Sequence, residues 1–318
     1  MEWSVVVSRV VAVIPCGRHL IRKPAVDALV KMRGLDFYEP ATQNKCDANN
    51  HNPWPWTFFE SSGHVMDLNP LPMSNQAPRV SIVIPAKNEA VRLPPSIRQI
   101  RSTFPDEAWE FIIVIELSTD GTEAAVRDAI GGDPRFVVIA NPVARGKGYA
   151  VKTGMLRARG DMVFFMDADL SVPLGYIPEF LNQAGDADVL VGSRRHPSSI
   201  IRVHQSITRE LSGRIFNLAL RLAGITRLAD TQCGFKAFRR DAAQAVFSKL
   251  EQDGFGFDVE ALLLASQLGF RALELPVEWA DVKGSKVSFL SGFEALRDAI
   301  LAARRIKRKY PSHANSRS

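Results

Sequence analysis

From residue 79 onward, short apolar runs rich in β-branched residues alternate with stretches of helical composition, and this alternation restricts the fold more than any other feature. Each of the runs 80–84, 111–115 and 136–139 is predicted to form a buried strand. The runs 162–166 and 187–191 predict a fourth and a fifth strand. Strands that alternate with helices predict an α/β fold, in which a mostly parallel sheet is covered by helices on both faces.

Helices are predicted in the intervals between and after these strands. They cover 89–103, a stretch from Gly121 through 130, 146–159 and 204–222. Pro94 and Pro95 fall near the start of the first helix, where proline is tolerated. Ligands of such sheets bind beyond the carboxyl ends of the strands, so the residues that follow each strand are the first candidates for a functional site.

The first 78 residues have a different composition. Six prolines lie between residues 40 and 78 among Asn, Ser and Asp, and each fixes φ and removes a backbone donor. We therefore predict a largely irregular N-terminal extension over 1–78, an α/β domain over 79–288, and a C-terminal amphipathic basic helix and tail over 289–318. Met73 lies just before the ordered pattern, which leaves open whether it is the true start.

Composition and charge exclude several classes of protein. The 318 residues are 46% apolar and 23% charged, as in an ordinary globular protein. Forty Lys and Arg against 34 Asp and Glu give a net charge of +6, but no basic face interleaved with aromatics and no known motif indicates nucleic acid as a partner. Three scattered cysteines are too few for a disulfide framework or a thiolate zinc site, which favours a reducing compartment.

A membrane span is not predicted, and the sequence leaves open whether the protein is soluble or sits at a membrane surface. No run reaches the roughly 20 apolar residues that a spanning helix needs. The run 5–14 contains Arg9 and lacks a cleavage site, so it is not predicted to be a signal peptide. We expect a cytoplasmic protein, peripheral at most to the cytoplasmic membrane face.

The predicted C-terminal helix is the segment that could contact a membrane surface. Its apolar stripe consists of Phe289, Phe293, Leu296, Ile300 and Ala303. The cations Arg304, Arg305, Lys307, Arg308 and Lys309 follow. Two interpretations stay open: the stripe packs on the domain, or it lies on an anionic membrane.

Two carboxylates follow the fourth strand directly. Asp167 and Asp169, separated by Ala168, stand at positions i and i+2 where the chain turns. Carboxylate oxygens suit Mg²⁺ or Mn²⁺, which hold diphosphates through one or two protein carboxylates and phosphate oxygens. A solvated turn uses the same residue types, so the motif indicates a metal only in a supporting context.

Eight motifs in order supply that context. The first four are SIVIPAKNE (81–89), STDGT (118–122), RGKG (145–148) and FMDADL (165–170). Their order and spacing resemble glycosyltransferase family 2, the nucleotide-sugar enzymes of GT-A fold. The others are VGSR (191–194), DTQCGFK (230–236), FDVE (257–260) and GSK (284–286). These resemble the polyprenyl-phosphate branch, and dolichyl-phosphate β-glucosyltransferases most closely.

The resemblance implies a Rossmann-like GT-A sheet and roles for single residues on the donor side. The nucleotide-sugar residues it implies are Pro85, Ala86, Glu89, Glu116, Asp120, Lys147, Asp167 and Ala168. Lys147 opens a helix whose N-terminal amides suit a diphosphate, and Asp167 and Asp169 are the implied ligands of Mg²⁺ or Mn²⁺. Asp120 is also a plausible helix cap. The pair Ile115-Glu116 departs from the usual acidic pair, which leaves the donor base open.

On the acceptor side the resemblance implies a polyprenyl or dolichyl phosphate. Its phosphate is expected at Arg194, Arg209, Ser212 and Lys286. Asp230 is expected at the catalytic centre, either as a base or as a group that orients the acceptor.

The implied activity is inverting transfer of a sugar, glucose first, from a nucleotide diphospho-sugar to that phosphate. Alternatives are transfer to a hydroxyl, mannosyl transfer from GDP-mannose, and a catalytically silent binding module. A dinucleotide oxidoreductase is disfavoured because no G-x-G-x-x-G follows the first strand.

Overall fold

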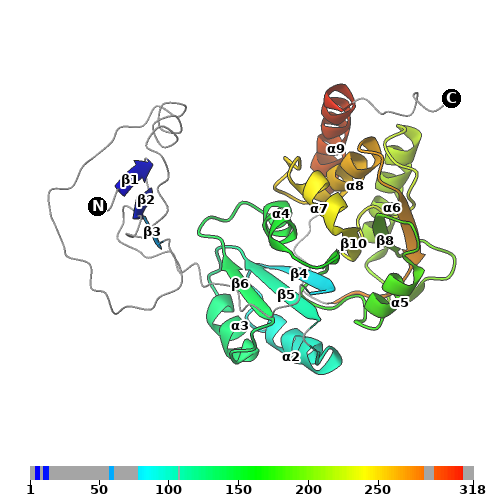
Figure 1. Ribbon diagram of the computed structural model, residues 1–318. Helices are drawn as coiled ribbons and strands as arrows, with labels where there is room; N and C mark the ends of the chain where they lie inside the picture. Colours follow the sequence, from blue (N-terminus) through cyan, green and yellow to red (C-terminus); the bar gives the residue numbers. More distant parts are fainter. Residues whose placement is uncertain are drawn as a thin grey trace, which may run out of the picture. The chain divides into compact units, whose positions relative to one another are not determined.

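The computed structural model describes residues 78–106, 108–282 and 290–310, with three short strands nearer the N-terminus (Figure 1). The chain divides into two compact units, Met1–Pro70 and Leu71–Ser318. In the first unit, β1 (Ser4–Val7), β2 (Val10–Val13) and β3 (Thr57–Glu60) form an antiparallel sheet with β2 in the centre. The proline-rich segment thus contributes an edge strand, the position in a sheet that proline-rich chains tolerate best.

The second unit is built on a mixed seven-stranded sheet in the order β11-β8-β10-β7-β4-β5-β6. Its strands are β4 (Val80–Ala86), β5 (Trp109–Ile115), β6 (Phe136–Ala140), β7 (Met162–Phe165), β8 (Val189–Ser193), β10 (Lys236–Arg239) and β11 (Ala272–Pro276). Only β10 runs antiparallel to its two neighbours, and all other neighbouring pairs are parallel. The prediction of a mostly parallel sheet is confirmed.

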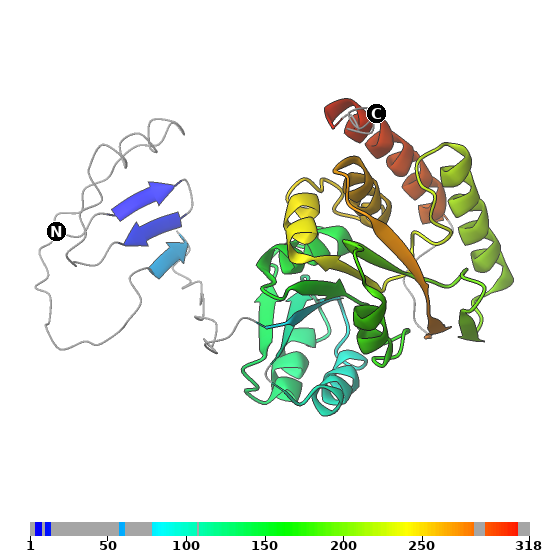
Figure 2. The same cartoon turned by 45° about the vertical axis from the view of Figure 1, so that its right-hand side comes forward.

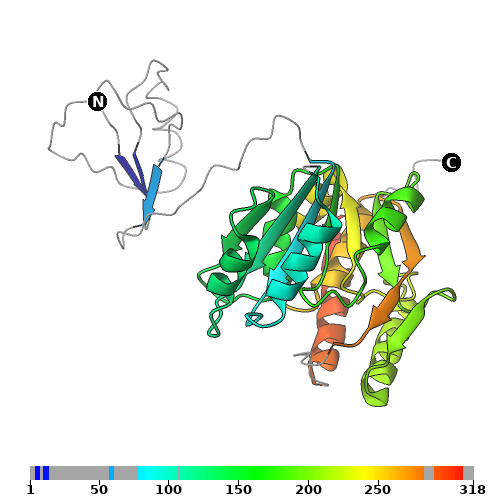
Figure 3. The ribbon, with the colours of Figure 1, turned by 90° about the horizontal axis from the view of Figure 1, so that it is seen from below.

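Helices cover both faces of this sheet, as the strand–helix alternation predicts. One face packs on α2 (Leu93–Thr103), α3 (Thr122–Ile130) and α5 (Tyr176–Gln183), and the other on α4 (Lys147–Arg157), α7 (Arg240–Phe247) and α8 (Phe257–Gln267). Figure 3 shows α2 lying along β4 and β5. Successive strand side chains point to opposite faces, so Ile82 and Ile84 enter one core while Val83 enters the other.

Two further helices pack beside the second core. Helices α6 (Ile207–Leu222) and α9 (Leu290–Lys309) lie next to each other (Figures 1 and 2). Ala303 of α9 is buried, and Ile300 packs on the same core. For this part of the apolar stripe the structure shows packing on the domain, while Phe289 and the side chains of Phe293 and Leu296 lie outside the described residues.

A small parallel pair, β9 (Ile200–Val203) and β12 (Glu278–Ala280), completes the architecture. Within the part of the chain that the structure describes, no helix has the length and apolar character to cross a bilayer.

Several predicted boundaries were wrong. The first strand does not end before Pro85 but continues to Ala86. Its pairing with β7 ends at Val83, so the N–H that Pro85 lacks is not needed for a hydrogen bond to β7. The first helix begins at Leu93, since the preceding residues form a loop in which Asn88 has φ +54°. Strands β10 and β11 were not predicted, because their short mixed sequences carry no apolar run.

Candidate active site

The loops after β4 and β5 are tied to each other at the carboxyl edge of the sheet. The backbone N–H of Asn88 donates to Ser118 Oγ (3.0 Å), and the N–H of Thr119 donates to Asn88 Oδ1 (2.9 Å). Asn88 adopts the left-handed conformation, which asparagine tolerates better than most residues. These contacts hold Pro85 and Ala86, the last residues of β4, beside a fixed loop.

Glu89 and Asp120 are both engaged within this loop pair. The Glu89 carboxylate accepts two hydrogen bonds from Arg92, at 2.7 and 2.6 Å. Asp120 accepts from the backbone N–H of Ala90 (3.0 Å) and of Thr122 (3.1 Å) at the start of α3. Asp120 precedes Gly121, the N-cap of α3, so it forms a local Asx turn and not the predicted helix cap, and it also joins the two loops.

Glu116 is buried directly after β5 and organises the loop that carries Lys147. Its Oε1 accepts from Asn141 Nδ2 (2.9 Å). Its Oε2 accepts from the backbone N–H groups of Arg145 (2.7 Å) and Gly146 (2.8 Å). The Glu116 carboxylate thus fixes the loop 145–147, which is the candidate for binding the diphosphate. The sequence pattern does not reveal this contact.

The same loop presses against the segment before α8. Gly146 has φ +129°, and a Cβ there would lie 2.5 Å from the carbonyl oxygen of Asp253, so a glycine is required. Arg145 donates to Asp253 (2.7 and 2.9 Å) and stacks on Tyr149, which engages its charge in a local ion pair.

Lys147, at the first turn of α4, meets the carboxylate of Asp167. Its Nζ donates to Asp167 Oδ1 at 2.6 Å. Burial alone would lower the pKa of Lys147, but the charges of Asp167, Asp258 and Asp169 outweigh it and raise that pKa. The two residues come from segments 20 positions apart, and the structure brings together a cation and a carboxylate that the sequence assigned to diphosphate and metal.

The turn after β7 holds the two predicted metal ligands. Asp169 Oδ1 accepts from the N–H (3.1 Å) and hydroxyl (2.6 Å) of Ser171. Ser96 of α2 donates its hydroxyl to the carbonyl of buried Ala168 (2.7 Å). Leu170 has φ +54°, an uncommon value for a branched residue, so the turn is held by its contacts rather than by local preference.

Gly234 lies directly against Asp167. A Cβ at Gly234 would come within 2.1 Å of Asp167 Oδ2, so a larger residue here would displace the Asp167 carboxylate. The neighbouring Cys233 is buried, and burial raises the pKa of its thiol to about 11. An inert packed cysteine agrees with the absence of a nearby histidine in the sequence.

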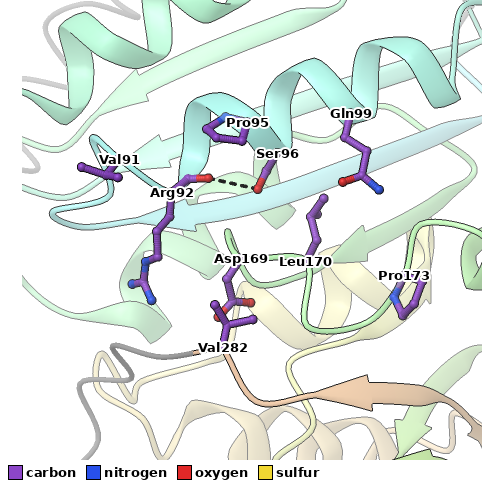
Figure 4. A pocket seen from close by; sticks show the side chains of 9 residues that line it. All are labelled: Val91, Arg92, Pro95, Ser96, Gln99, Asp169, Leu170, Pro173 and Val282. Atoms are coloured by element: carbon purple, nitrogen blue, oxygen red, sulfur yellow. Dashed lines mark hydrogen bonds between the residues drawn. The ribbon is translucent and has the colours of Figure 1, made fainter. Parts of the chain in front are cut away.

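A pocket of about 500 Å³ opens beside Asp169 (Figure 4). Its lining residues are Val91, Arg92, Pro95, Ser96, Gln99, Asp169, Leu170, Pro173 and Val282. Arg92 and Asp169 are its charged groups, and the hydrogen bond to Glu89 raises the pKa of Arg92 against the effect of burial. The pocket places space for a ligand next to Asp169.

Asp230 forms a buried ion pair with Arg194. It is fully buried, and its two oxygens accept from Arg194 Nε (2.7 Å) and Nη2 (2.9 Å). Burial acts to raise the pKa of Asp230, but the charge and hydrogen bonds of Arg194 outweigh it and hold that pKa well below its usual range. Glu274 on β11 accepts the backbone N–H of Asp230 (2.9 Å), which fixes the loop.

The remaining predicted acceptor residues are only partly described. Ser212 is half-buried on α6. Arg209 lies on the same helix, but its side chain is outside the described part, and so is all of Lys286. A second buried ion pair, Lys236 with Asp258 at 2.6 Å, was not predicted, and burial raises the pKa of that aspartate despite the lysine.

The donor set of the candidate metal site fits a hard cation. Asp169 offers carboxylate oxygens at the pocket and Asp167 at the smaller hollow beside Gly234, and Mg²⁺ commonly uses one or two carboxylates and completes its shell with phosphate and water. Among the described residues no cluster of three or more His, Cys, Asp or Glu forms a cage made of protein alone. The geometry suits a cation that arrives with a phosphate ligand.

Three comparisons place these observations among known proteins. A family model described as "Glycosyl transferase family 2" matches residues 81–247. The dolichyl-phosphate beta-glucosyltransferase of Drosophila melanogaster is 32% identical over 271 residues, covering 77% of this chain and 80% of that relative. Dolichyl-phosphate beta-glucosyltransferase ALG5C of Trichomonas vaginalis is 30% identical over 220 residues, and the chain spans 65% of its length.

Solved structures agree on the fold. Glucosyl-3-phosphoglycerate synthase from Mycobacterium tuberculosis, in complex with Mn²⁺, UDP and phosphoglyceric acid, superposes with a TM-score of 0.54 at 20% identity. The superposition covers 76% of this chain and 81% of that one. At 20% identity this similarity supports the GT-A fold alone. With the family model spanning more than half of the chain and relatives at 30% identity and above, this protein belongs to glycosyltransferase family 2.

Proposed function

We propose that this protein transfers glucose from UDP-glucose, with inversion at the anomeric carbon, to the phosphate of a dolichol or another polyprenol. The observation that carries the proposal is the pair of Asp167 and Asp169 beside Lys147 at the carboxyl edge of a GT-A sheet. Relatives named dolichyl-phosphate beta-glucosyltransferase cover most of this chain and supply the acceptor class.

The donor diphosphate would lie between Lys147 and the turn 167–169. Asp167 and Asp169 would hold Mg²⁺ or Mn²⁺, which supplies charge neutralisation to the departing nucleoside diphosphate. Lys147 gives fixed positive charge at the same place, and Glu116 keeps its loop rigid through two backbone N–H groups. We assign the nucleoside to the tied loops after β4 and β5, from Pro85 to Asp120.

Asp230 acts here as a positioning group. Its two carboxylate oxygens are occupied by Arg194, and its pKa is low, so it is a poor proton acceptor. A phosphate acceptor is already anionic at neutral pH and requires orientation more than deprotonation. This observation favours a phosphate over a hydroxyl acceptor.

The acceptor chain is a membrane lipid, so we propose that the domain works at a membrane surface. Residues 79–288 form the catalytic domain in this proposal, with 1–78 as an extension and 289–318 as the C-terminal helix and tail.

The test is a transfer assay with UDP-[¹⁴C]glucose and polyprenyl phosphate. We expect a labelled lipid product that disappears with EDTA and returns with Mg²⁺ or Mn²⁺. Polyprenol without phosphate serves as the control acceptor, and equal labelling of it would overturn the proposed acceptor class. Calorimetric titration with UDP and GDP decides the base, and tighter binding of GDP would replace the glucosyl proposal with a mannosyl one.

A further inference from the structure

Arg195 carries a buried polar atom that nothing in the described part of the chain satisfies. Among the side-chain nitrogen and oxygen atoms buried within the described residues, Arg195 Nε is the one without a hydrogen-bond partner. A buried N–H without an acceptor costs about 1–3 kcal/mol, and more when the group is charged. The neighbouring Arg194 shows the contrast, because its guanidinium donates twice to Asp230.

The carboxylates near Arg195 are engaged by other residues. Glu210 Oε1 accepts from Arg214 at 2.6 Å, and its Oε2 faces His204 at 3.3 Å. Asp230 is held by Arg194. Among the described residues, Arg194, Arg195 and Arg214 therefore face two carboxylates, and each carboxylate is already paired with an arginine other than Arg195.

The electrostatic environment of Arg195 reflects this excess. Burial first, and then the charges of Arg194 and Arg214, lower the pKa of Arg195, although Asp230 and Glu210 act in the opposite direction. Such a cation gains a large favourable interaction when an anion arrives beside it.

The backbone around Arg195 holds the side chain in place. Its own N–H donates to Ser193 Oγ (3.2 Å) at the end of β8. On the other side, Gly213 of α6 faces the guanidinium so closely that a Cβ there would lie 3.3 Å from Nη2. Arg195 is thus set between the end of β8 and the middle of α6.

This position adjoins the candidate active site. Arg194, one residue earlier, lies over the ring of Trp279 at 5.5 Å. Trp279 and Gly234 line a small hollow together with Asp167. The charge of Asp167 also acts on Arg194, so the residue that precedes Arg195 links it to the pairs that the proposed reaction uses.

We propose that Arg195 binds the phosphate of the acceptor, a phosphate monoester of a long-chain isoprenoid alcohol. This assignment rests on the proposed function and replaces Arg194, whose Nε and Nη2 donate to Asp230, as the main phosphate contact. The planar guanidinium suits phosphate through paired N–H donors, and Arg194 with Asp230 positions it.

The experiment compares the wild type with Arg195→Ala and with Arg221→Ala, which removes the same charge from an exposed position on α6. Thermal unfolding is followed with and without inorganic phosphate, farnesyl phosphate and farnesol. We expect the phosphates, but not farnesol, to raise the Tm of the wild type and of Arg221→Ala. Arg195→Ala should lose this response while melting no lower than the wild type without ligand.

Two results would overturn the proposal. If Arg195→Ala melts several degrees lower without phosphate, its role is structural, and if phosphate still stabilises it equally, the anion binds elsewhere. Kinetics supply the second readout: we expect Arg195→Ala to raise the KM for farnesyl phosphate at least ten-fold with the donor KM unchanged, and Arg195→Lys to recover part of it. A wild type that binds phosphate at Arg195 without any transfer would refute the proposed function and leave the anion site standing.

Discussion

The carboxyl edge of the sheet contains two carboxylate–cation pairs of almost equal length and opposite accessibility. Lys147 and Asp167 lie 2.6 Å apart, and the Asp167 side chain is 37% exposed. Arg194 and Asp230 lie 2.7 Å apart, and the Asp230 side chain is 0% exposed. The comparison shows that a short ion-pair distance does not by itself identify a reacting group. An accessible pair can exchange its cation for a metal or a substrate, whereas a buried pair is fixed by the cost of separating its charges.

Their surroundings explain the difference. Asp167 stands on an open turn against Gly234, with Lys147 beside it. Asp230 receives further backbone N–H bonds from Arg194 and Gln232, and Glu274 holds its own N–H. Burial with full hydrogen bonding makes Asp230 part of the framework.

The largest effect is expected when the buried pair is broken. Arg194→Met or Asp230→Asn should lower the free energy of unfolding by about 3–5 kcal/mol, because each change strands a buried partner. Urea titration followed by circular dichroism measures it. The double variant Arg194→Met/Asp230→Leu should lose much less than the sum of the two single changes. A strictly additive result would mean that the pair is not coupled.

Breaking the open pair should affect turnover instead of stability. Asp167→Ala or Asp169→Asn should lower kcat/KM for transfer by more than ten-fold, since each removes a candidate metal ligand. The Tm should stay within about 2 °C of the wild type. Asp186→Asn, at an exposed surface position, is the matched control and should keep full activity. Retained activity above one-tenth of the wild type would remove Asp167 and Asp169 from the metal site.

A smaller effect is expected from the group that supports the open pair. Glu116→Gln keeps the shape of the side chain but removes the charge that accepts the N–H groups of Arg145 and Gly146. We expect a loss of about 1 kcal/mol in donor binding, which is about a five-fold rise in the KM for the nucleotide sugar. Glu123→Gln, in an exposed pair on α3, is the control. An unchanged donor KM would show that the loop does not depend on Glu116.

The smallest effect concerns pH. The folded-state pKa of Asp230 lies below its unfolded value of about 3.9, so the unfolded chain takes up the proton first on acidification. The stability that this group contributes is therefore complete above about pH 4 and is lost as pH falls through the folded-state pKa. We expect the wild type and the double variant Arg194→Met/Asp230→Leu to show the same pH dependence of unfolding from pH 5 to 8. Divergence within that range would contradict the assignment.

The sequence by itself determined the sheet and the place of the site. Continuous apolar runs predicted β4, β5 and β7, because a strand buried on both faces needs no polar side. Asp167 and Asp169 could be placed at the functional edge of the sheet because they directly follow β7, and parallel strands bring their carboxyl ends to one edge.

Only the tertiary structure decided which charged residues are open and which are enclosed. The sequence marks both Asp167 and Asp230 as candidates for the catalytic centre. Only the structure shows that Asp230 is buried against Arg194 and held by Glu274 of β11, whereas the Asp167 side chain stays 37% exposed. The same holds for Arg194 and Arg195, adjacent residues of one type: one is neutralised by Asp230 and the other is left with a buried, unpaired N–H. Desolvation depends on segments distant in the chain, so no local pattern of residues reports it.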